Sequence, residues 1–252
     1  MPTPTISVVI ITKNAERTLE RCLRSVEWAT ETLVVDSGSN DDTLTIAEKL
    51  GAKVHTSDWR GFGPQKNLAM RLATSDWILS IDADEFVTPN LAQEIMSVVG
   101  DLNAHDVYEL DRISEYCGRK MLHSGWRPDY VARLFKSGKA EFSQDLVHER
   151  LLFKGVPGRL MGKLDHDSFY SPDEVIEKMN RYSTLGAQQL FDAGKQSGVL
   201  TPLLHAAGAF LKTYVFRAGF LDGAEGFFLA ISNAEGAYYK YVKLHYLNKR
   251  KH

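Results

Sequence analysis

The sequence is poor in cysteine and has no long hydrophobic run. Cys22 and Cys117 are the only two cysteines among 252 residues, and they form no Cys-x-x-Cys pair. A disulfide framework and a zinc–thiolate site are therefore not expected, and the composition fits a reducing cytoplasm. The longest uncharged stretch, 196–211, includes Gln, Ser, Pro and His. It is shorter than the ~20 apolar residues that span a bilayer. We expect a cytoplasmic protein that reaches a membrane only peripherally, at its cytoplasmic surface.

The sequence also lacks an excess of charge of either sign. Lys and Arg number 30 against 32 Asp and Glu, which gives a net charge of −2. A nucleic-acid-binding protein would be strongly basic, so no nucleic-acid partner is expected. Hydrophobic residues make up 44% and charged residues 25%, as in an ordinary globular protein.

Strand and helix patterns alternate through the first hundred residues. Short apolar runs predict strands at 6–11, 32–36, 53–56 and 77–81, and helical periodicity predicts helices at 16–28, at 41–50 and from Pro64 onward. This alternation is typical of a parallel sheet, which binds ligands beyond the carboxyl ends of its strands. Polar residues follow three of these strands, so we expect them to converge on one site.

The pattern changes in the second half of the chain. A helix over 91–99 precedes strand-like runs at 107–110, 130–135 and 146–153. Ser171 to Glu174 form a capping box that begins a long amphipathic helix. We predict a ligand-binding half over 1–98, a second half of the same domain over 99–170, and a helical C-terminal region over 171–252.

The most informative short motif is Asp82-Ala83-Asp84 at the end of an apolar strand. Two carboxylates at this spacing repel each other unless a cation or a donor lies between them, and oxygen ligands suit Mg²⁺ or Mn²⁺. Asp36 ends a neighbouring strand, and Lys66 lies at a helix start near the same edge. The alternatives are solvated acids in a strand-end turn and an ordinary solvated lysine.

Four segments in consistent order carry a family resemblance: SVVIITKNA, LVVDSGSNDDT, GFGPQKNLA and WILSIDADE. Together they resemble the inverting GT-A glycosyltransferases of family 2. The resemblance implies an α/β GT-A fold, in which helices flank a mostly parallel central sheet, with a helical C-terminal appendage. It also implies that Thr12, Asn14 and Asp36 hold the base and ribose of the nucleotide.

Three further roles follow from the same resemblance. Lys66 would face the nucleotide, Asp82 would contact the ribose, and Asp84 would bind the divalent metal, Mg²⁺ or Mn²⁺. His166 is a candidate further metal ligand, since imidazole suits Mn²⁺, although a single histidine is more often a structural hydrogen-bonding residue.

The second half resembles a narrower group, the bacterial lipopolysaccharide inner-core glucosyltransferases that add β-1,4-glucose to heptose. The segments that carry this likeness are WRPD (126–129), RLF (133–135), VHE (147–149), His166, GFLDG (219–223) and KYVKL (240–244). The resemblance implies metal-dependent transfer of a hexose, glucose from UDP-glucose, to a heptose of the lipopolysaccharide core. Another cell-surface glycan acceptor and a non-catalytic sugar-nucleotide-binding protein are the alternatives.

Inverting transfer needs a carboxylate that accepts the proton of the acceptor hydroxyl. Glu149 is the favoured base, Asp145 is the second candidate and Asp129 the third; Glu149 could instead be a surface charge paired with a neighbour. Arg127 and Arg133 are candidates for binding phosphate or an anionic acceptor, because guanidinium matches such groups. Either could equally be a salt-bridged surface residue.

Other enzyme classes fit the sequence less well. The turn after the first strand lacks the glycines of a dinucleotide-binding loop, and no P-loop motif is present. A dehalogenase-type phosphatase places its Asp-x-Asp on the first strand, whereas here two strand–helix units precede it. A sugar nucleotidyltransferase would begin with a glycine-rich loop, which is also absent.

The C-terminal fifth combines aromatic and basic residues. We hypothesise that its lysines and arginine dock on anionic lipid, as aromatic and basic segments do at bilayer interfaces. Alternatively, the aromatics fill the core of the appendage or an oligomer interface, and the tail is only solvated. The basic residues of this hypothesis are Lys240, Lys243, Lys249, Arg250 and Lys251.

Overall fold

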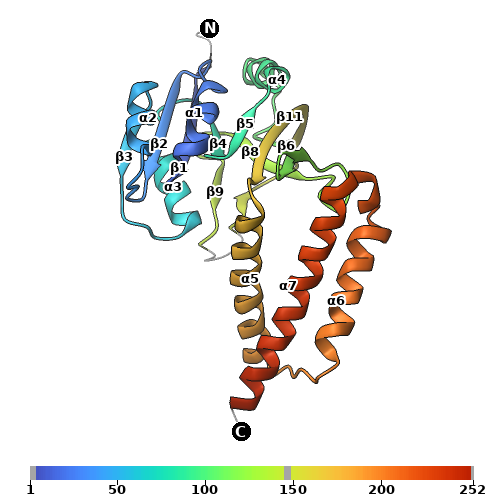
Figure 1. Cartoon of the computed structure of the whole chain (residues 1–252). Coiled ribbons are helices and arrows are strands. Elements are labelled where there is room, and N and C mark those ends of the chain that lie inside the picture. Colours follow the sequence, from blue (N-terminus) through green and yellow to red (C-terminus); the bar gives the residue numbers. More distant parts are fainter. Residues whose placement is uncertain (1–3, 145–148, 251–252) are drawn as a thin grey trace. The chain divides into compact units, whose positions relative to one another are not determined.

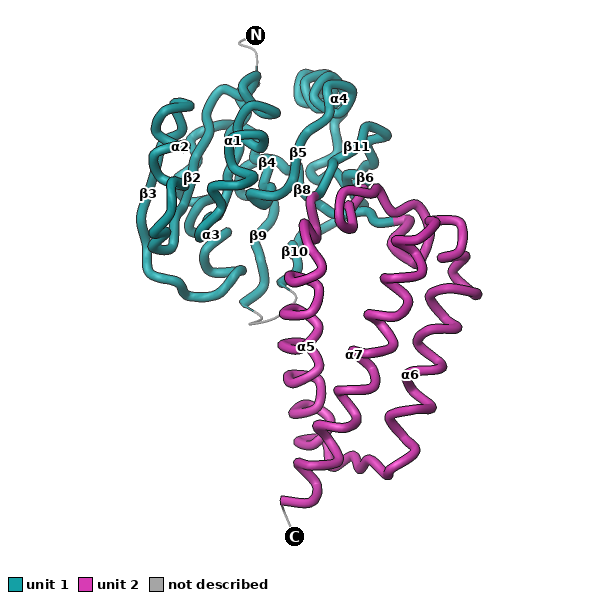
Figure 2. Tube along the Cα trace, viewed as in Figure 1, with its two compact units in different colours: residues 1–112, 129–166 teal, residues 113–128, 167–252 magenta. Residues whose placement is uncertain are grey.

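The computed structural model describes residues 4–144 and 149–250, which form two compact units (Figure 2). The first unit consists of residues 1–112 and 129–166, and the second of 113–128 and 167–252. The boundaries therefore differ from the functional division predicted at 98 and 170, which stays a prediction. Residues 113–128, which interrupt the first unit in sequence, belong to the second.

Four parallel strands form the first part of the central sheet (Figure 1). They are β1 (Ile6–Thr12), β2 (Glu31–Asp36), β3 (Lys53–Thr56) and β4 (Trp77–Asp82). In the register, Thr12 lies opposite Asp36, and Ile11 lies opposite Asp82. The polar residues that follow β1, β2 and β4 therefore meet at one edge, as the sequence predicts.

Antiparallel strands extend this sheet. Over the described residues the sheet has nine strands in the order β3-β2-β1-β4-β8-β6-β11-β5, and β7 pairs with β6. A separate two-stranded sheet pairs β9 with β10. The added strands are β5 (Glu85–Val87), β6 (Val107–Tyr116), β7 (Arg119–Lys120), β8 (Tyr130–Lys136), β9 (Ala140–Phe142), β10 (Leu151–Phe153) and β11 (Gly158–Phe169).

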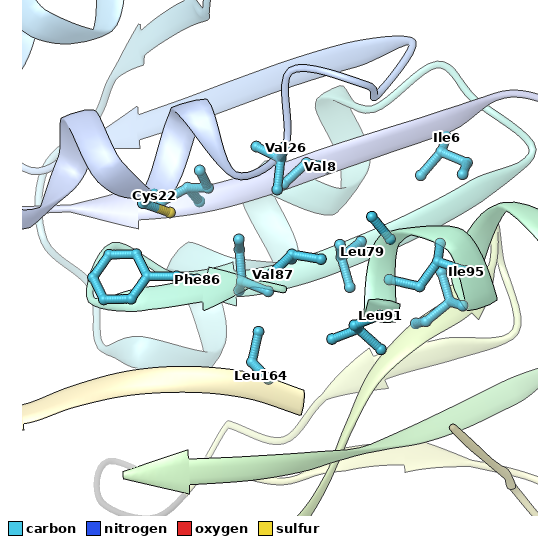
Figure 3. Close-up of a cluster of buried hydrophobic side chains, with 14 of the residues drawn as sticks. Ile6, Val8, Cys22, Val26, Leu79, Phe86, Val87, Leu91, Ile95 and Leu164 are labelled. Atoms are coloured by element: carbon cyan, nitrogen blue, oxygen red, sulfur yellow. The ribbon is translucent and has the colours of Figure 1, made fainter. Parts of the chain in front are cut away.

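Helices cover both faces of the parallel strands. Alternate side chains of β1 point to opposite faces of the sheet and pack against these helices. Val8 lies in one cluster with Cys22 of α1 and Leu91 of α4 (Figure 3), whereas Val9 lies in another with Ala69 of α3. Both clusters are buried, which explains why the strand sequence is continuously apolar. The helices of this unit are α1 (Glu16–Arg24), α2 (Thr43–Lys49), α3 (Phe62–Leu72) and α4 (Pro89–Val99).

The second unit is mainly helical. Its helices are α5 (Pro172–Asp192), α6 (Thr201–Leu211) and α7 (Gly223–Arg250), with a π-helical turn η1 (Lys212–Phe216) and a 3₁₀ turn η2 (Gly219–Asp222) between α6 and α7. Both α5 and α6 pack against α7. Ser171 caps α5 as predicted, since its hydroxyl accepts a hydrogen bond from the Glu174 amide. None of the helices described, α1 to α7, is long and apolar enough to cross a membrane.

Several element boundaries differ from the sequence predictions; the strand predicted over 107–110, for example, is β6 and extends to Tyr116. The helix predicted over 16–28 ends at Arg24, and the Ser25 hydroxyl donates to the Cys22 carbonyl at its end. The helix predicted from Pro64 begins at Phe62, since the first turn tolerates a residue without an N–H. The strand predicted over 146–153 is β10, Leu151–Phe153, and residues 145–148 lie outside the described residues.

Candidate active site

Asp36 lies at the carboxyl end of β2 and is fully buried. Its Oδ2 accepts hydrogen bonds from the hydroxyls of Thr12 (2.9 Å) and Ser39 (2.5 Å), and its Oδ1 accepts from the amides of Gly38 and Ser39 (2.8 Å each). Burial acts to raise the pKa of Asp36, but these hydrogen bonds outweigh it and lower the pKa. An ionised carboxylate therefore joins the ends of β1 and β2.

Asn14 links the loops that follow these two strands. Its amide donates to the Ser39 hydroxyl (2.8 Å), and its Oδ1 accepts from the Asn40 amide (3.0 Å). Asn14 has a positive φ of 51°, a conformation that asparagine tolerates better than most residues. The structure thus brings Thr12, Asn14 and Asp36 together, and their role in holding a nucleotide stays a prediction.

Lys66 occupies the centre of the site. This side chain, on α3, is 3% exposed, and its Nζ lies 2.9 Å from Asp82 Oδ1 and 2.9 Å from Glu149 Oε1. The alternative of an ordinary solvated lysine is therefore wrong. One ammonium connects the acid that ends β4 with a carboxylate from the second half of the chain.

Gly63 allows this approach. A Cβ atom at Gly63 would lie 1.9 Å from the Ser143 carbonyl oxygen and 3.7 Å from Glu149 Cβ. Only a residue without a side chain lets the backbone around Ser143 pack this closely against the first turn of α3. Asn67 adds to the contact, since its side chain exchanges two 2.8 Å hydrogen bonds with the backbone of Phe142.

Asp82 is bound from the other side by Arg133 of β8. Arg133 Nη2 lies 2.6 Å from Asp82 Oδ2 and 2.6 Å from Glu85 Oε1. Burial acts to raise the pKa of Asp82, but Arg133 and Lys66 hold it well below its ordinary value. Within the described residues, Arg133 Nε is buried and has no hydrogen-bond partner. Arg133 was predicted either to bind phosphate or an anionic acceptor or to be a salt-bridged surface residue. It is salt-bridged, but it is buried and does not lie at the surface.

Glu85 anchors the turn between β4 and β5. It is fully buried, and its carboxylate accepts hydrogen bonds from the Asp82 amide (3.0 Å), Arg133 (2.6 Å) and Arg112 Nη1 (3.0 Å). Arg112 Nε also donates to Asp129 Oδ2 at 2.8 Å. Groups of alternating charge thus follow one another in the order Lys66, Asp82, Arg133, Glu85, Arg112 and Asp129. Asp129, the third candidate base, is therefore paired with Arg112.

Asp84 and His166 form the place where a metal would fit. His166 Nε2 of β11 lies 3.6 Å from Asp84 Oδ2, and the Asp84 side chain is 41% exposed. In residues 4–144 and 149–250, no group of three or more His, Cys, Asp or Glu side chains is arranged to hold a metal. Two side-chain ligands of this kind leave several positions for substrate phosphates, as Mg²⁺ and Mn²⁺ sites do. Asp82 is paired with Lys66 and Arg133, whereas the role of Asp84 as a metal ligand stays a prediction.

The structure does not place two of the predicted residues relative to this cluster. Asp145, the second candidate base, lies outside the described residues. Arg127 lies in the second unit, and its predicted role stays a prediction. Glu149 itself is 17% exposed and paired with Lys66, so it is not simply a surface charge.

Sequence reasoning missed Glu85 and Arg112 as site residues. Glu85 directly follows the Asp-x-Asp motif. Three acids this close together need cationic partners wherever they are buried, so the pattern could have indicated such partners. Arg112 carries no such signal, because its partners Glu85 and Asp129 come together only through the pairing of β6 with β8.

The comparison with protein families is decisive. The model of "Glycosyl transferase family 2" matches residues 7–156. The chain belongs to glycosyltransferase family 2. The family resemblance of the four N-terminal segments is thereby confirmed, and the protein is an enzyme that transfers a glycosyl group.

Similar proteins agree with this assignment. An uncharacterized glycosyltransferase of Rickettsia typhi is 31% identical over 96% of this chain and 87% of its own length. The lipopolysaccharide core biosynthesis glycosyltransferase LpsC of Rhizobium meliloti is 28% identical over 97% of this chain and 93% of its own. The crystal structure of Staphylococcus aureus TarS 1–349 covers 98% of this chain and 92% of its own, with 16% identity and a TM-score of 0.50. That likeness supports the GT-A fold.

Proposed function

We propose that this glycosyltransferase moves glucose from UDP-glucose to a heptose of the lipopolysaccharide inner core, with inversion at the anomeric carbon. The core-type motifs of the second half and the likeness to LpsC support this acceptor class. The central observation is the position of Lys66, whose Nζ lies 2.9 Å from both Asp82 and Glu149. It joins the donor-side acid to the acceptor-side carboxylate that an inverting transfer requires.

Glu149 is proposed as the general base. In a single displacement, the acceptor hydroxyl attacks the anomeric carbon while the bond to the nucleoside diphosphate breaks, and the carboxylate takes the hydroxyl proton. The Glu149 carboxylate has an ammonium 2.9 Å away.

Asp84 and His166 are proposed to hold a divalent cation. When bound, Mg²⁺ or Mn²⁺ would neutralise charge on the departing diphosphate. Asp82 is proposed to accept a hydrogen bond from the donor ribose, and Lys66 and Arg133 keep it ionised for that purpose. Thr12, Asn14 and Asp36 are proposed to shape the loops that receive the nucleoside.

The test of the base combines two measurements on Glu149→Gln. Calorimetric titration with UDP and Mn²⁺ should give the wild-type affinity, since the substitution is on the acceptor side. Transfer to a truncated lipopolysaccharide core that ends in heptose should fall by roughly 10²–10⁴-fold, the contribution of a general base. Glu141→Gln, an exposed glutamate on the neighbouring strand β9, is the matched control and should keep full activity.

Two results would change the assignment. If Asp145→Asn is inactive while Glu149→Gln retains transfer, Asp145 is the base. If UDP-glucose binds but no heptose-ended core accepts glucose, the acceptor is another cell-surface glycan. Release of UDP with a series of core truncations distinguishes these cases.

A further inference from the structure

Helix α6 is apolar but almost entirely exposed. Among its residues, Thr201–Leu211, only Pro202 is buried. The exposed fractions are 57% for Leu203, 72% for Leu204 and 47% for Leu211. A surface helix of a globular protein normally turns such residues toward a core.

Leu204 and Leu211 are spaced at i and i+7 and so lie on one side of α6, whereas Leu203 lies on an adjacent face. The exposed apolar residues continue into η1. Val215 is 48% exposed and Phe216, at the end of η1, is 81% exposed. We call Leu203, Leu204, Leu211, Val215 and Phe216 the apolar α6 surface. Figure 2 shows α6 packed along α7, and α7 is the helix that α6 contacts extensively.

The charges in this part of the chain have one sign. From residue 193 to residue 221 there is no Asp or Glu, whereas Lys195, Lys212 and Arg217 are present. The exposed faces of α5 differ, because Ile176 there is flanked by Asp173, Glu174 and Glu177. The apolar α6 surface therefore lies in a segment of the chain whose charged residues are all cationic.

We propose that the apolar α6 surface inserts into the headgroup region of an anionic lipid bilayer. Cations of this segment complement anionic headgroups, and exposed leucines and a phenylalanine reach the acyl boundary, as in interfacial helices. A second copy of this chain fits less well, because self-pairing would bring Lys212 and Arg217 toward their own copies with no acid to match them. The inference does not depend on which sugar the enzyme transfers.

The same structure makes the basic tail a weaker candidate for this role. Lys243 Nζ donates to Asn180, Ser183 and Thr184 of α5 at 2.7–2.9 Å, so it holds the helices together. Lys251 lies outside the described residues. The hypothesis of the five-residue basic set stays a prediction, and lipid docking by α6 and η1 is a separate proposal.

The test is co-sedimentation of the full chain with vesicles of phosphatidylcholine containing phosphatidylglycerol. We expect binding to these vesicles, weak binding to pure phosphatidylcholine, and a partial loss at high salt, because salt screens the charges but not the insertion. The double variant Leu204→Glu, Leu211→Glu should bind at least about tenfold more weakly, since apolar burial drives insertion. Both residues are exposed, so its thermal unfolding should match the wild type.

Ile176→Glu is the matched control. It introduces the same charge at an exposed apolar position, 55% exposed, on another helix of the same unit, and binding should be unchanged. The proposal is overturned if the wild type does not bind anionic vesicles or if the double variant binds as the wild type does. It is also overturned if ultracentrifugation shows a dimer that the double variant dissociates, since a second copy would then cover the surface.

Discussion

Glu85 shows how one buried side chain arranges the acids around it. Its carboxylate binds the Asp82 amide and two guanidinium groups, yet no polar atom of Glu85 is exposed for a substrate. Because Arg133 bridges Glu85 to Asp82, the position of the Asp82 carboxylate depends on Glu85. We regard Glu85 as a positioning residue that acts through the turn and through Arg133.

Glu85→Gln should therefore change donor recognition more than turnover. The amide keeps the shape but lowers the negative charge between two arginines, so we expect KM for the donor to rise about tenfold with a smaller change in kcat. Stability should fall by about 1–3 kcal/mol, the cost of weakening charged hydrogen bonds. Urea unfolding and steady-state kinetics measure both. Glu109→Gln, whose partner Arg159 is largely exposed, is the control and should lose at most about 1 kcal/mol.

Asp84 makes a separate prediction about metal. In Asp84→Ala, the increase in UDP affinity that Mn²⁺ gives should disappear, because the cation loses its exposed carboxylate ligand; His166→Ala should weaken the increase. Calorimetric titration of UDP with and without Mn²⁺ measures this without any acceptor. An unchanged metal dependence in Asp84→Ala would exclude this carboxylate as a ligand.

At the scale of the elements, Glu31 ties together the start of the parallel sheet. At the beginning of β2, its carboxylate accepts hydrogen bonds from Ser7 of β1 (2.5 Å), Lys53 of β3 (2.7 Å) and the Thr74 amide before β4 (3.1 Å). Burial acts to raise the pKa of Glu31, but Lys53, Ser7 and Thr74 lower it to about 2.

A pH dependence of stability follows. Since the pKa of Glu31 in the folded protein is lower than its ordinary value of 4.5, its stabilising effect is complete above that value. The effect is lost as the pH falls from about 4.5 toward 2. We expect Glu31→Gln to be less stable at pH 7 by about 1–3 kcal/mol and to lose less stability than the wild type over this acid range. Denaturant unfolding at pH 7, 4.5 and 3 checks it, and parallel curves for the two proteins would contradict it.

At the same scale, the parallel half of the fold could be predicted from the sequence more fully than the antiparallel half. The strand β1 is recognisable as a continuous apolar run, and the helix α1 by apolar residues at helical spacing. The strands β5 and β9, which were not predicted, contain only three residues each, too few for a period to appear. Strand β11 was not predicted at all.

The site divides in the same way. Asp36, Asp82 and Lys66 follow or begin regular elements of the parallel half, and the structure brings them to one edge. The contacts of Glu149 and Arg133 depend on pairing between residues far apart in sequence: Lys66 and Glu149 are 83 positions apart. No local pattern encodes such a pair, and the sequence did not predict it.

At the scale of the whole chain, Asp222 joins two distant segments of the second unit. Its side chain is 3% exposed and accepts hydrogen bonds from the amides of Leu122 and His123 (3.1 Å) and from the Ser124 hydroxyl (2.7 Å). Asp222→Ala leaves these donors buried without a partner, so we expect a loss of about 2–4 kcal/mol, with Asp222→Asn intermediate. Urea unfolding measures it. Asp192→Ala, which removes only a surface contact with Gln188, should change stability by less than about 0.5 kcal/mol.

The interrupted order of the two units has a consequence during synthesis. Residues 113–128 leave the ribosome early, but the carboxylate that binds Leu122 lies 100 positions later in the chain. At about 5–20 residues per second, this segment waits roughly 5–20 s for its partner. During the first part of that time Met121, which is fully buried in the finished protein, has neither Val175 nor Leu229 to cover it, and Leu229 is made last. The nascent chain therefore carries Met121 without its complete apolar cover until α7 emerges.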